Sequence, residues 1–378
     1  MSLLLTPEQL ANDLAVRDLT DPGQGRHVIQ LIVDHAVKAL VHKWNCETRW
    51  CRGERTVTVE DNYDRLGYDA ADVTREARYT RYVTKRQLLR SHSTAMVPAA
   101  LRGLAVSPVD DVLLVCPGVV YRRDSIDRLH TGTPHQLDLW RVTSLARLST
   151  ADLNDMVATL VHALLPGMRY RCEPRVHPYT VDGVQIDVER AGEWVEIAEC
   201  GLAHSHVLAG AGLSDVYSGL ALGMGLDRVL MLRKEIPDIR LLRSAAPAVA
   251  RQMLDLERYR PVSAMPAVRR DISIAVAPDD TAEDLGDRAR TALGTDAACL
   301  ESVDLLSETP CAALPSPALD RLGARLDQKN VLVRIVLRHL ERTLSDIDAN
   351  LLRDRVYAAL HQGTNHQWTT SQSDNGSR

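Results

Sequence analysis

The spacing of apolar and polar residues predicts three adjacent strands in the middle of the chain. Apolar runs at 112–120 and 135–140 are joined by a polar loop, which is the pattern of two neighbouring strands. A third run, 219–225, has glycine at every second position and leads into a helical pattern that carries Arg228 near its start. Glycines inside a strand indicate a surface that a ligand approaches closely, although they also occur at bulges.

Two helical patterns precede this region, at 7–17 and 27–44, with a turn at 21–25 between them. Residues 47–60 predict a hairpin that turns at 52–54. The second helix has an apolar stripe, which is typical of core or subunit packing; it consists of Ile29, Ile32, Val33, Ala36, Val37, Leu40 and Val41. We therefore expect residues 1–60 to pack on a core domain at 61–247.

The pattern changes beyond residue 247, where we expect a linker at 248–262. The region 263–363 predicts the order strand, helix, strand, strand, helix, at 269–276, 281–293, 300–306, 331–338 and 347–360. This order predicts a ferredoxin-like α/β sandwich. Residues 312–326 are expected to form a loop and residues 364–378 a disordered tail.

The composition of the chain excludes several classes of protein. A chain of 378 residues can hold one sizeable domain and one smaller module, and its net charge of -5 argues against uniform wrapping in nucleic acid. There is no apolar stretch of membrane-spanning length and no leader pattern, so we expect a cytoplasmic protein without a membrane partner. The seven cysteines are scattered and do not form a disulfide framework.

Polar residues on the first two strands are candidates for chemistry. Alternation places Arg122 and Asp124 on one face, and Gln136 and Asp138 on one face of the returning strand. An exposed hairpin with solvated charges would have the same pattern. The functional interpretation is favoured because the glycine-rich strand and Arg228 follow about ninety residues later.

This order resembles motifs 2 and 3 of the class II aminoacyl-tRNA synthetases. Most of the chain resembles the phenylalanyl-tRNA synthetases, in particular their catalytic chain and the single-chain organellar form. The segments that carry the resemblance are Leu88-Leu-Arg-Ser-His-Ser-Thr-Ala95, Tyr121-Arg-Arg-Asp124, His135-Gln136, Pro174-Arg-Val-His-Pro-Tyr-Thr180, Trp194-Val-Glu-Ile-Ala-Glu-Cys-Gly201, Ile236-Pro-Asp-Ile-Arg240 and, in the C-terminal module, Arg269-Arg-Asp-Ile-Ser273.

The resemblance implies an α+β fold, with an antiparallel-sheet catalytic core and a C-terminal ferredoxin-like anticodon-binding domain. It implies ATP-dependent activation of phenylalanine, or a related aromatic amino acid, as an aminoacyl-adenylate that is then transferred to tRNA. ATP and Mg²⁺ are the implied cofactors and tRNA the implied partner. The single-chain form implies a monomer or homodimer without a separate β subunit.

The resemblance also assigns roles to residues at the ATP site. Arg122 would hold the α-phosphate and the amino-acid carboxylate, and Arg228 would lie on adenine and reach the γ-phosphate. Asp124 would contact the adenine edge or the ammonium group. The remaining implied ATP and metal residues are His130 in the motif 2 loop, Gly223 and Gly225 in the glycine-rich strand, and Glu196 and Glu199 for Mg²⁺.

The implied amino-acid pocket combines groups for the backbone and for the ring of the substrate; it consists of His92, Thr94, Gln136, Asp138, His177, Tyr179 and Ala221. Four cations of the C-terminal module could contact RNA phosphates or form a solvated face; they are Lys329, Arg334, Arg338 and Arg342.

Three positions depart from the family pattern. Asp138 replaces a longer Glu, His177 replaces an aromatic residue or Asn, and Pro134 stands where a Phe stacks on adenine. These departures leave two alternatives open. One is a paralogue that activates a non-standard aromatic amino acid for another acceptor or serves as an inhibitor-resistant duplicate. The other is a catalytically silent RNA-binding relative.

The chain contains no phenylalanine, although 45% of its residues are hydrophobic. Drift in a Leu- and Val-rich background would explain this. A second hypothesis is that the enzyme must still be translated when charged phenylalanine tRNA is scarce.

Overall fold

The computed structural model describes residues 4–77, 79–123, 127–261 and 265–366. The chain forms two compact units. The core unit consists of Met1–Arg122, Thr133–Leu242 and Ala250–Tyr259, and the C-terminal unit consists of Arg123–Gly132, Arg243–Val249 and Arg260–Arg378. Residues 1–60 therefore share a unit with the predicted core, and the predicted linker is divided between the two units.

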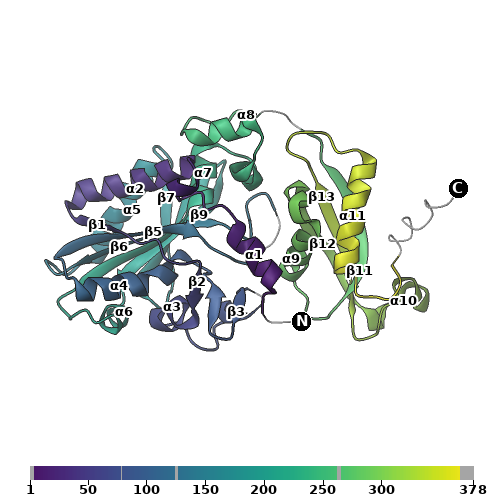
Figure 1. The fold of residues 1–378 in the computed structure, drawn as a ribbon, viewed down its shortest axis with the longest axis horizontal. Helices are drawn as coiled ribbons and strands as arrows, with labels where there is room; N and C mark the ends of the chain where they lie inside the picture. The colour runs from purple at the N-terminus through teal and green to yellow at the C-terminus, as the bar shows by residue number, and fades with distance from the viewer. Residues whose placement is uncertain (1–3, 78, 124–126, 262–264, 367–378) are drawn as a thin grey trace. The chain divides into compact units, whose positions relative to one another are not determined.

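A seven-stranded sheet is the centre of the core unit (Figure 1). Its strands, in order across the sheet, are β1 (Glu47–Trp50), β5 (Asp111–Val119), β6 (His135–Thr143), β10 (Ser218–Gly225), β9 (Glu193–Ala203), β8 (Thr180–Arg190) and β7 (Tyr170–Pro174). All neighbours are antiparallel except β1 and β5. The three strands predicted from the sequence, β5, β6 and β10, are thus adjacent, as expected.

Helices cover both faces of this sheet (Figure 1). One face carries α2 (Val28–Trp44), α5 (Thr150–Leu164) and α7 (Leu226–Lys234), and the other carries α4 (Val97–Val106) and α6 (Ser205–Gly210). The apolar stripe predicted for α2 is buried, with the exception of Val41 at its edge. Side chains of α4 and α6 pack with those of β5, β6 and β10, which makes the apolar core under the second face.

A small sheet follows the N-terminal helix α1 (Pro7–Ala15); its order is β2 (Thr56–Thr58), β4 (Gln87–Leu89), β3 (Tyr82–Thr84), and α3 (Val59–Asn62) follows β2 directly. The hairpin predicted at 47–60 is wrong. Strand β1 pairs in parallel with β5, and β2 pairs with β4 in the other sheet. Turn residues show that the chain can reverse there, but burial against the apolar strand β5 decides the partner of β1.

The C-terminal unit has an antiparallel sheet in the order β11 (Val268–Val276), β13 (Lys329–Leu337), β12 (Leu300–Pro310). Helices α9 (Ala282–Leu293) and α11 (Asp346–Leu360) contribute to its apolar core. The predicted order of elements is present. The described residues hold three strands in this unit, so the ferredoxin-like assignment stays a prediction.

The predicted loop at 312–326 is wrong, because it contains α10 (Ser316–Leu322). Pro317 lies in its first turn, and Gly323 ends it in the left-handed conformation with φ of 57°. Proline at the start and glycine at the end are helix boundary signals, so the sequence did carry this information. The short helix α8 (Pro247–Ala250) falls at the start of the predicted linker.

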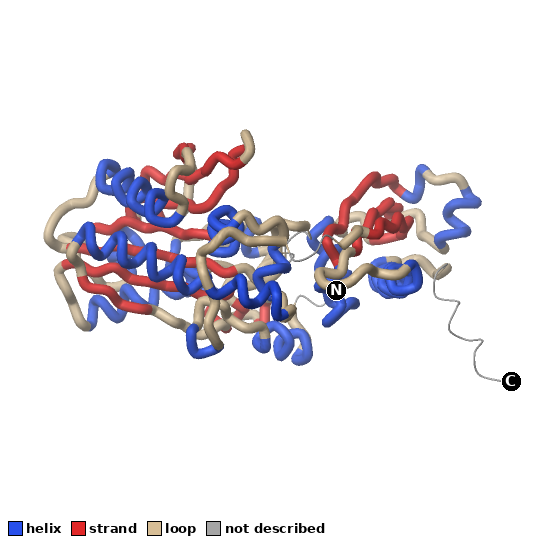
Figure 2. Tube along the Cα trace, turned by 90° about the horizontal axis from the view of Figure 1, so that it is seen from above, coloured by secondary structure: helices blue, strands red, loops and turns tan. Residues whose placement is uncertain are grey.

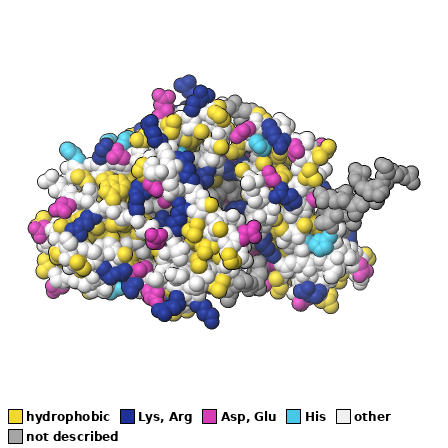
Figure 3. Space-filling view, viewed as in Figure 1, with side chains coloured by type: hydrophobic (Ala, Val, Ile, Leu, Met, Phe, Trp, Pro, Cys, Tyr) yellow, Lys and Arg dark blue, Asp and Glu magenta, His cyan; other side chains and the backbone are white. Residues whose placement is uncertain are grey.

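Figure 2 shows the same layering of helices on strands within each unit, seen at right angles to the first view. On the face shown in Figure 3, Lys and Arg side chains are interspersed with Asp and Glu side chains, in keeping with the small net charge. Within the described ranges, no helix is long and apolar enough to cross a membrane.

Candidate active site

The sheet surface formed by β6, β10 and β9 is the floor of the site, and small residues lie on it. Asp138 of β6 lies opposite Gly223 of β10, and Gln136 lies opposite Gly225. A Cβ atom added at Gly223 would come no closer than 3.6 Å to another heavy atom, and one at Gly225 no closer than 4.0 Å. A side chain at either position would thus meet only ordinary van der Waals contacts, which is compatible with the prediction that this glycine-rich strand leaves room for a ligand.

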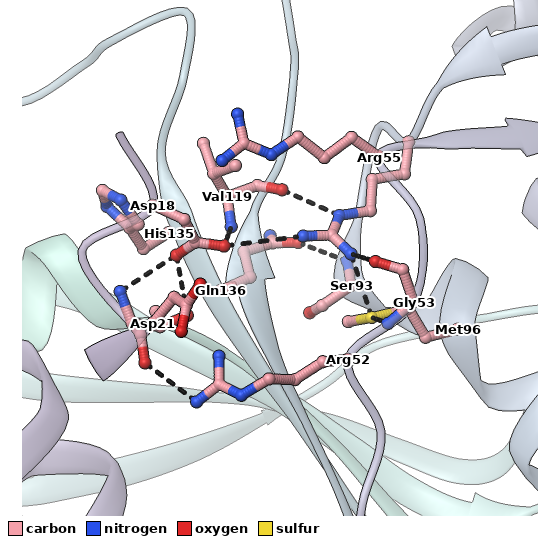
Figure 4. A network of polar contacts seen from close by, with 12 residues as sticks. Asp18, Asp21, Arg52, Gly53, Arg55, Ser93, Met96, Val119, His135 and Gln136 are labelled. Carbon is pink, nitrogen blue, oxygen red and sulfur yellow. Dashed lines mark hydrogen bonds and ion pairs between the residues drawn. The ribbon is translucent and has the colours of Figure 1, made fainter. Parts of the chain in front are cut away.

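Ser93 brings the two polar residues of β6 together. Its backbone N–H donates to Gln136 Oε1 (3.1 Å), and its hydroxyl donates to Asp138 Oδ2 (2.6 Å). Figure 4 shows Ser93 beside Gln136 within this network. Trp140 Nε1 donates to Asp138 Oδ1 (3.3 Å). Ser93 was missed in the sequence interpretation, although it stands between the two predicted residues His92 and Thr94.

Asp138 is a buried carboxylate, with 2% of its surface exposed. Burial raises its pKa to about 6, against the opposing effect of hydrogen bonds from Ser93, Thr94 and Trp140 and of the Arg122 charge. A cationic partner would stabilise the ionised form of this buried carboxylate, because it lowers the free-energy cost of ionisation. The ammonium group of an amino acid has the required charge.

Two arginines are oriented by backbone carbonyl groups. Arg122 Nε donates to the carbonyl oxygen of Ser91 (2.9 Å), and Arg228 Nη1 donates to that of Glu196 (2.8 Å). A carbonyl group fixes the guanidinium without neutralising it. Both side chains therefore keep their charge for an anionic ligand.

The start of α7, where Arg228 lies, is fastened to the start of β6. Asp227 accepts a hydrogen bond from the backbone N–H of His135, and its other carboxylate oxygen lies 3.0 Å from His135 Nδ1. His135 Nε2 in turn accepts from the N–H of Leu19 (3.1 Å). In the same network Asp18 accepts from the N–H of Val119 at 3.1 Å (Figure 4). The N-terminal segment thus holds the ends of β5 and β6 in place.

Aromatic rings gather beside the floor. Tyr179 stacks on Trp140 (6.2 Å between centroids) and on His177 (5.4 Å), and Tyr68 stacks on His92 (5.8 Å). Burial raises the pKa of Tyr179 well above its usual value, and a hydrogen bond with Thr94 acts against this.

Most of the predicted amino-acid residues therefore meet in one place. Ala221 joins them through its register partner Trp140. Tyr68 and Trp140 were not predicted as pocket residues. Continuing the alternation from Gln136 and Asp138 would have found Trp140, whereas Tyr68 gave no signal in the sequence.

The two ring nitrogens of His177 both have close contacts within the protein. Nε2 lies 2.9 Å from Glu199 Oε2, and Nδ1 lies 3.3 Å from Thr180 Oγ1. Glu199 also accepts a hydrogen bond from Arg175 Nε (3.0 Å). This predicted magnesium ligand therefore already contacts two basic side chains.

Glu196 and Glu199 are the two carboxylates predicted to hold Mg²⁺. Burial raises the pKa of Glu196, and the charge of Glu199 raises it further. Among the described residues no group of three His, Cys, Asp or Glu side chains could hold a metal ion. Mg²⁺ is commonly bound through one or two carboxylates together with substrate phosphates. Glu196 and Glu199 therefore fit Mg²⁺ only when substrate phosphates supply the other ligands.

The loop that holds the predicted ATP residues Asp124 and His130 belongs to the C-terminal unit. Asp124 lies outside the described residues. His130 belongs to the C-terminal unit, where its Nδ1 lies 2.6 Å from Asp127 Oδ2. Its place at the ATP site stays a prediction. Pro134 uses its carbonyl oxygen to accept from the N–H of Val120 (2.8 Å), a contact that any residue could make.

Each of the four predicted RNA-binding cations forms an ion pair with a carboxylate of the C-terminal unit. The pairs are Lys329 with Glu308 (2.9 Å), Arg334 with Asp271 (2.8 Å), Arg342 with Asp348 (2.9 Å), and Arg338 with Glu301. RNA phosphates would have to compete with these carboxylates.

Known proteins match mainly the part of the chain that forms the core unit. The family model "tRNA synthetases class II core domain (F)" matches residues 13–253. The phenylalanine--tRNA ligase alpha subunit of Mycobacterium avium (strain 104) is 31% identical over 239 residues, which cover 60% of this chain and 67% of that protein. That of Nostoc sp. (strain PCC 7120) is 28% identical over 246 residues, covering 64% and 72%.

The similarity to another relative extends further along the chain. The probable mitochondrial phenylalanine--tRNA ligase of Drosophila melanogaster is 26% identical over 362 residues, covering 80% of this chain and 75% of that protein. The chain spans about two thirds of the length of the mycobacterial alpha subunits. The family match covers more than half of the chain, and the chain belongs to the class II tRNA synthetases of the phenylalanine (F) core family.

Proposed function

We propose that this protein activates phenylalanine with ATP to form phenylalanyl-adenylate and transfers the phenylalanyl group to tRNA. The observation that carries the proposal is the group of residues on one face of the sheet. Asp138, held by Ser93, lies opposite Gly223, and the ring pocket begins at Trp140 two residues further along β6. Class II family membership supports the use of ATP.

The reaction needs positioning and charge neutralisation. An oxygen of the amino-acid carboxylate attacks the α-phosphate of ATP, the bond from that phosphorus to the bridging oxygen breaks, and pyrophosphate leaves. Arg122 and Arg228 stabilise the negative charge on the phosphates, since neither is neutralised by a described carboxylate. Asp138 holds the ammonium group, which keeps the carboxylate in line for attack. Mg²⁺, bound to the phosphates through Glu196 and Glu199, would neutralise further charge.

The lining of the pocket favours phenylalanine over hydroxylated substrates. His177 suggested a polar pocket, but its Nε2 lies 2.9 Å from Glu199 Oε2 without forming a hydrogen bond, and its Nδ1 lies 3.3 Å from Thr180 Oγ1, so both nitrogens face groups of the protein. The Tyr179 hydroxyl interacts with Thr94. A hydroxyl group on the substrate ring would lose its bonds to water and find few partners here, which costs binding free energy.

The first experiment is amino-acid-dependent ATP–pyrophosphate exchange with the twenty amino acids and several hydroxylated aromatic ones. Exchange with phenylalanine, at least about tenfold better than with tyrosine, is expected from the loss of one hydrogen bond. Exchange only with a hydroxylated substrate would overturn the assignment of the amino acid. Absence of exchange with every substrate would favour the silent RNA-binding relative.

We further propose that this chain charges tRNA without a second type of subunit. The support is the match along 80% of the chain to a single mitochondrial ligase. The purified chain alone should aminoacylate tRNA with phenylalanine. A requirement for added β subunit in that assay would refute this part of the proposal.

A further inference from the structure

Two cysteines occupy neighbouring positions at the edge of the core sheet formed by β1 and β5. The register of these parallel strands pairs Trp50 with Val115, and the backbone N–H of Cys51 donates to the carbonyl oxygen of Val115 (2.8 Å). In a parallel ladder this bond goes to the carbonyl group that precedes the partner residue, so Cys51 continues the register opposite Cys116. Both thiols are free, and the two side chains pack in the same apolar cluster.

The spacing of the strands allows a disulfide between these positions. Neighbouring strands lie about 4.7–4.9 Å apart, and the Cα atoms of a disulfide are usually about 4.4–6.8 Å apart. Side chains at paired positions point to the same face of the sheet. A bond between the sulfur atoms of Cys51 and Cys116 therefore needs rotation of the side chains and no movement of either strand.

The two thiols differ in exposure and in acidity. Cys51 is half-buried, whereas Cys116 is fully buried. A hydrogen bond from the Cys116 thiol lowers the pKa of Cys51, and burial acts against this; the same bond and burial raise the pKa of Cys116 well above its usual value. The thiolate is the form of cysteine that attacks an oxidant. Cys51 is therefore the thiol that reacts with a soluble oxidant, and Cys116 is the neighbour that can bond to the product.

The pair is continuous with the floor of the site. Cys116 is the register partner of Asp138 on β6, and Asp138 is the register partner of Gly223 on β10. The charge of Asp138 also contributes to the raised pKa of Cys116, as expected of neighbouring side chains. One row of side chains thus crosses the sheet from the half-buried thiol of Cys51 to the carboxylate that holds the ammonium group in the proposed reaction.

We propose that Cys51 and Cys116 are a redox-sensitive pair, which hydrogen peroxide closes to a disulfide, and that the closed form binds phenylalanine more weakly. To bond with Cys51, the sulfur of Cys116 turns towards β1 and away from Asp138. Because protein interiors are close-packed and transmit such changes, the carboxylate loses packing on that side. The effect on phenylalanine rests on the proposed function, whereas the chemistry of the thiols does not.

The oxidation proceeds in two steps. The Cys51 thiolate attacks one oxygen of hydrogen peroxide, the O–O bond breaks, and the hydroxide that leaves takes up the thiol proton as water. The sulfur of Cys116 then attacks the sulfenic acid at Cys51, the S–O bond breaks, and the hydroxyl group leaves as water with the proton of Cys116. The two sulfur atoms are oxidised, and the two peroxide oxygens are reduced to water.

The substitution Cys172→Ser provides the background for the test, because Cys172 is exposed and every other cysteine except Cys51 is buried. After treatment with hydrogen peroxide this protein should lose the mass of two hydrogen atoms, and non-reducing digestion should give a peptide pair that joins Cys51 to Cys116. Dithiothreitol should restore both thiols. Adding Cys51→Ser should abolish the loss of mass. A protein in which Cys51 gains oxygen and stays unlinked would overturn the proposal.

ATP–pyrophosphate exchange then measures the effect of the disulfide on the amino-acid site. In the Cys172→Ser protein, peroxide should raise the KM for phenylalanine at least about threefold and change the KM for ATP less than about twofold. Dithiothreitol should reverse the rise, and the matched control with Cys51→Ser should show none. An unchanged KM for phenylalanine in the closed form would overturn the link to Asp138. The mass measurement needs no turnover, so failure of the proposed function would be recognised separately, by the absence of exchange before any treatment.

Discussion

The cations predicted to bind anions in the two units are held by different kinds of partner. In the core unit, Arg122 and Arg228 each donate to a backbone carbonyl group. In the C-terminal unit, each of the four cations predicted to bind RNA forms an ion pair with a carboxylate, as Arg334 does with Asp271. A carbonyl group orients a guanidinium and leaves its charge in place, whereas a carboxylate neutralises it.

This difference teaches that the type of residue does not by itself identify an anion site. The arginines of the core unit are prepared for a phosphate, since binding does not require another anion to be displaced. The cations of the C-terminal unit would exchange one anion for another, with a smaller gain in free energy. We expect removal of the first kind to be costly and removal of the second kind to have little effect.

Arg228→Ala should have the largest effect, because the phosphate loses a charged donor that was oriented beforehand. The rate of ATP–pyrophosphate exchange should fall at least about 100-fold, while circular dichroism and thermal unfolding stay close to wild type. Arg334→Ala is the matched control and should leave exchange unchanged. Near-normal exchange in Arg228→Ala would remove that residue from the site.

Asp138→Asn should raise the KM for phenylalanine about 100-fold, because the ammonium group loses a charged hydrogen-bond acceptor. The exchange assay measures this, with the KM for ATP as the internal control. An unchanged KM for phenylalanine would show that another group holds the ammonium.

The same variant should be more stable than the wild type at pH 8. The pKa of Asp138 is raised from 3.8 to about 6 by burial, so the folded state disfavours the ionised carboxylate. The destabilisation is complete above pH 6 and disappears as the pH falls towards 3.8. Urea unfolding should therefore give Asp138→Asn an advantage of up to about 3 kcal/mol at pH 8 and little at pH 4. The opposite trend with pH would contradict the assignment.

Alanine substitutions at two glycines on neighbouring strands should have different effects, one on ATP binding and the other on stability. A Cβ at Gly223 meets only Asp138, at 3.6 Å, so Gly223→Ala should fold normally and raise the KM for ATP about tenfold by filling the floor. A Cβ at Gly201 would lie 2.7 Å from Thr180 Cβ, so Gly201→Ala should lose about 1–3 kcal/mol of stability. Equal effects of both on unfolding would show that Gly223 is needed only for packing.

Arg334→Ala should have the smallest effect, with tRNA binding weakened less than about threefold at physiological salt. Asp271→Asn releases the arginine from its partner and should tighten tRNA binding slightly, most clearly at low salt. Filter binding over a series of salt concentrations measures both. A loss of tenfold or more in Arg334→Ala would break the contrast between the two units.

Local patterns predicted most of the elements. The apolar stripe of α2, the strands β5, β6 and β10, and the order of the elements in the C-terminal unit follow from periodicity and caps. The pairing of strands that are distant in the sequence was harder to predict. Strand β1 was predicted to pair with its neighbour in sequence and instead pairs with β5, about sixty residues later, because the partner depends on which apolar surface is available for burial.

The sequence by itself determined the family, the polar residues of β6 and the two arginines, since these lie in motifs with fixed spacing. The tertiary structure alone decided their electrostatic state. It buried Asp138 and raised its pKa, gave both nitrogens of His177 a contact, and placed Cys51 beside Cys116. It also paired Arg334 with Asp271. Motifs report which residues are present, but charge and hydrogen bonding depend on neighbours that only folding brings together.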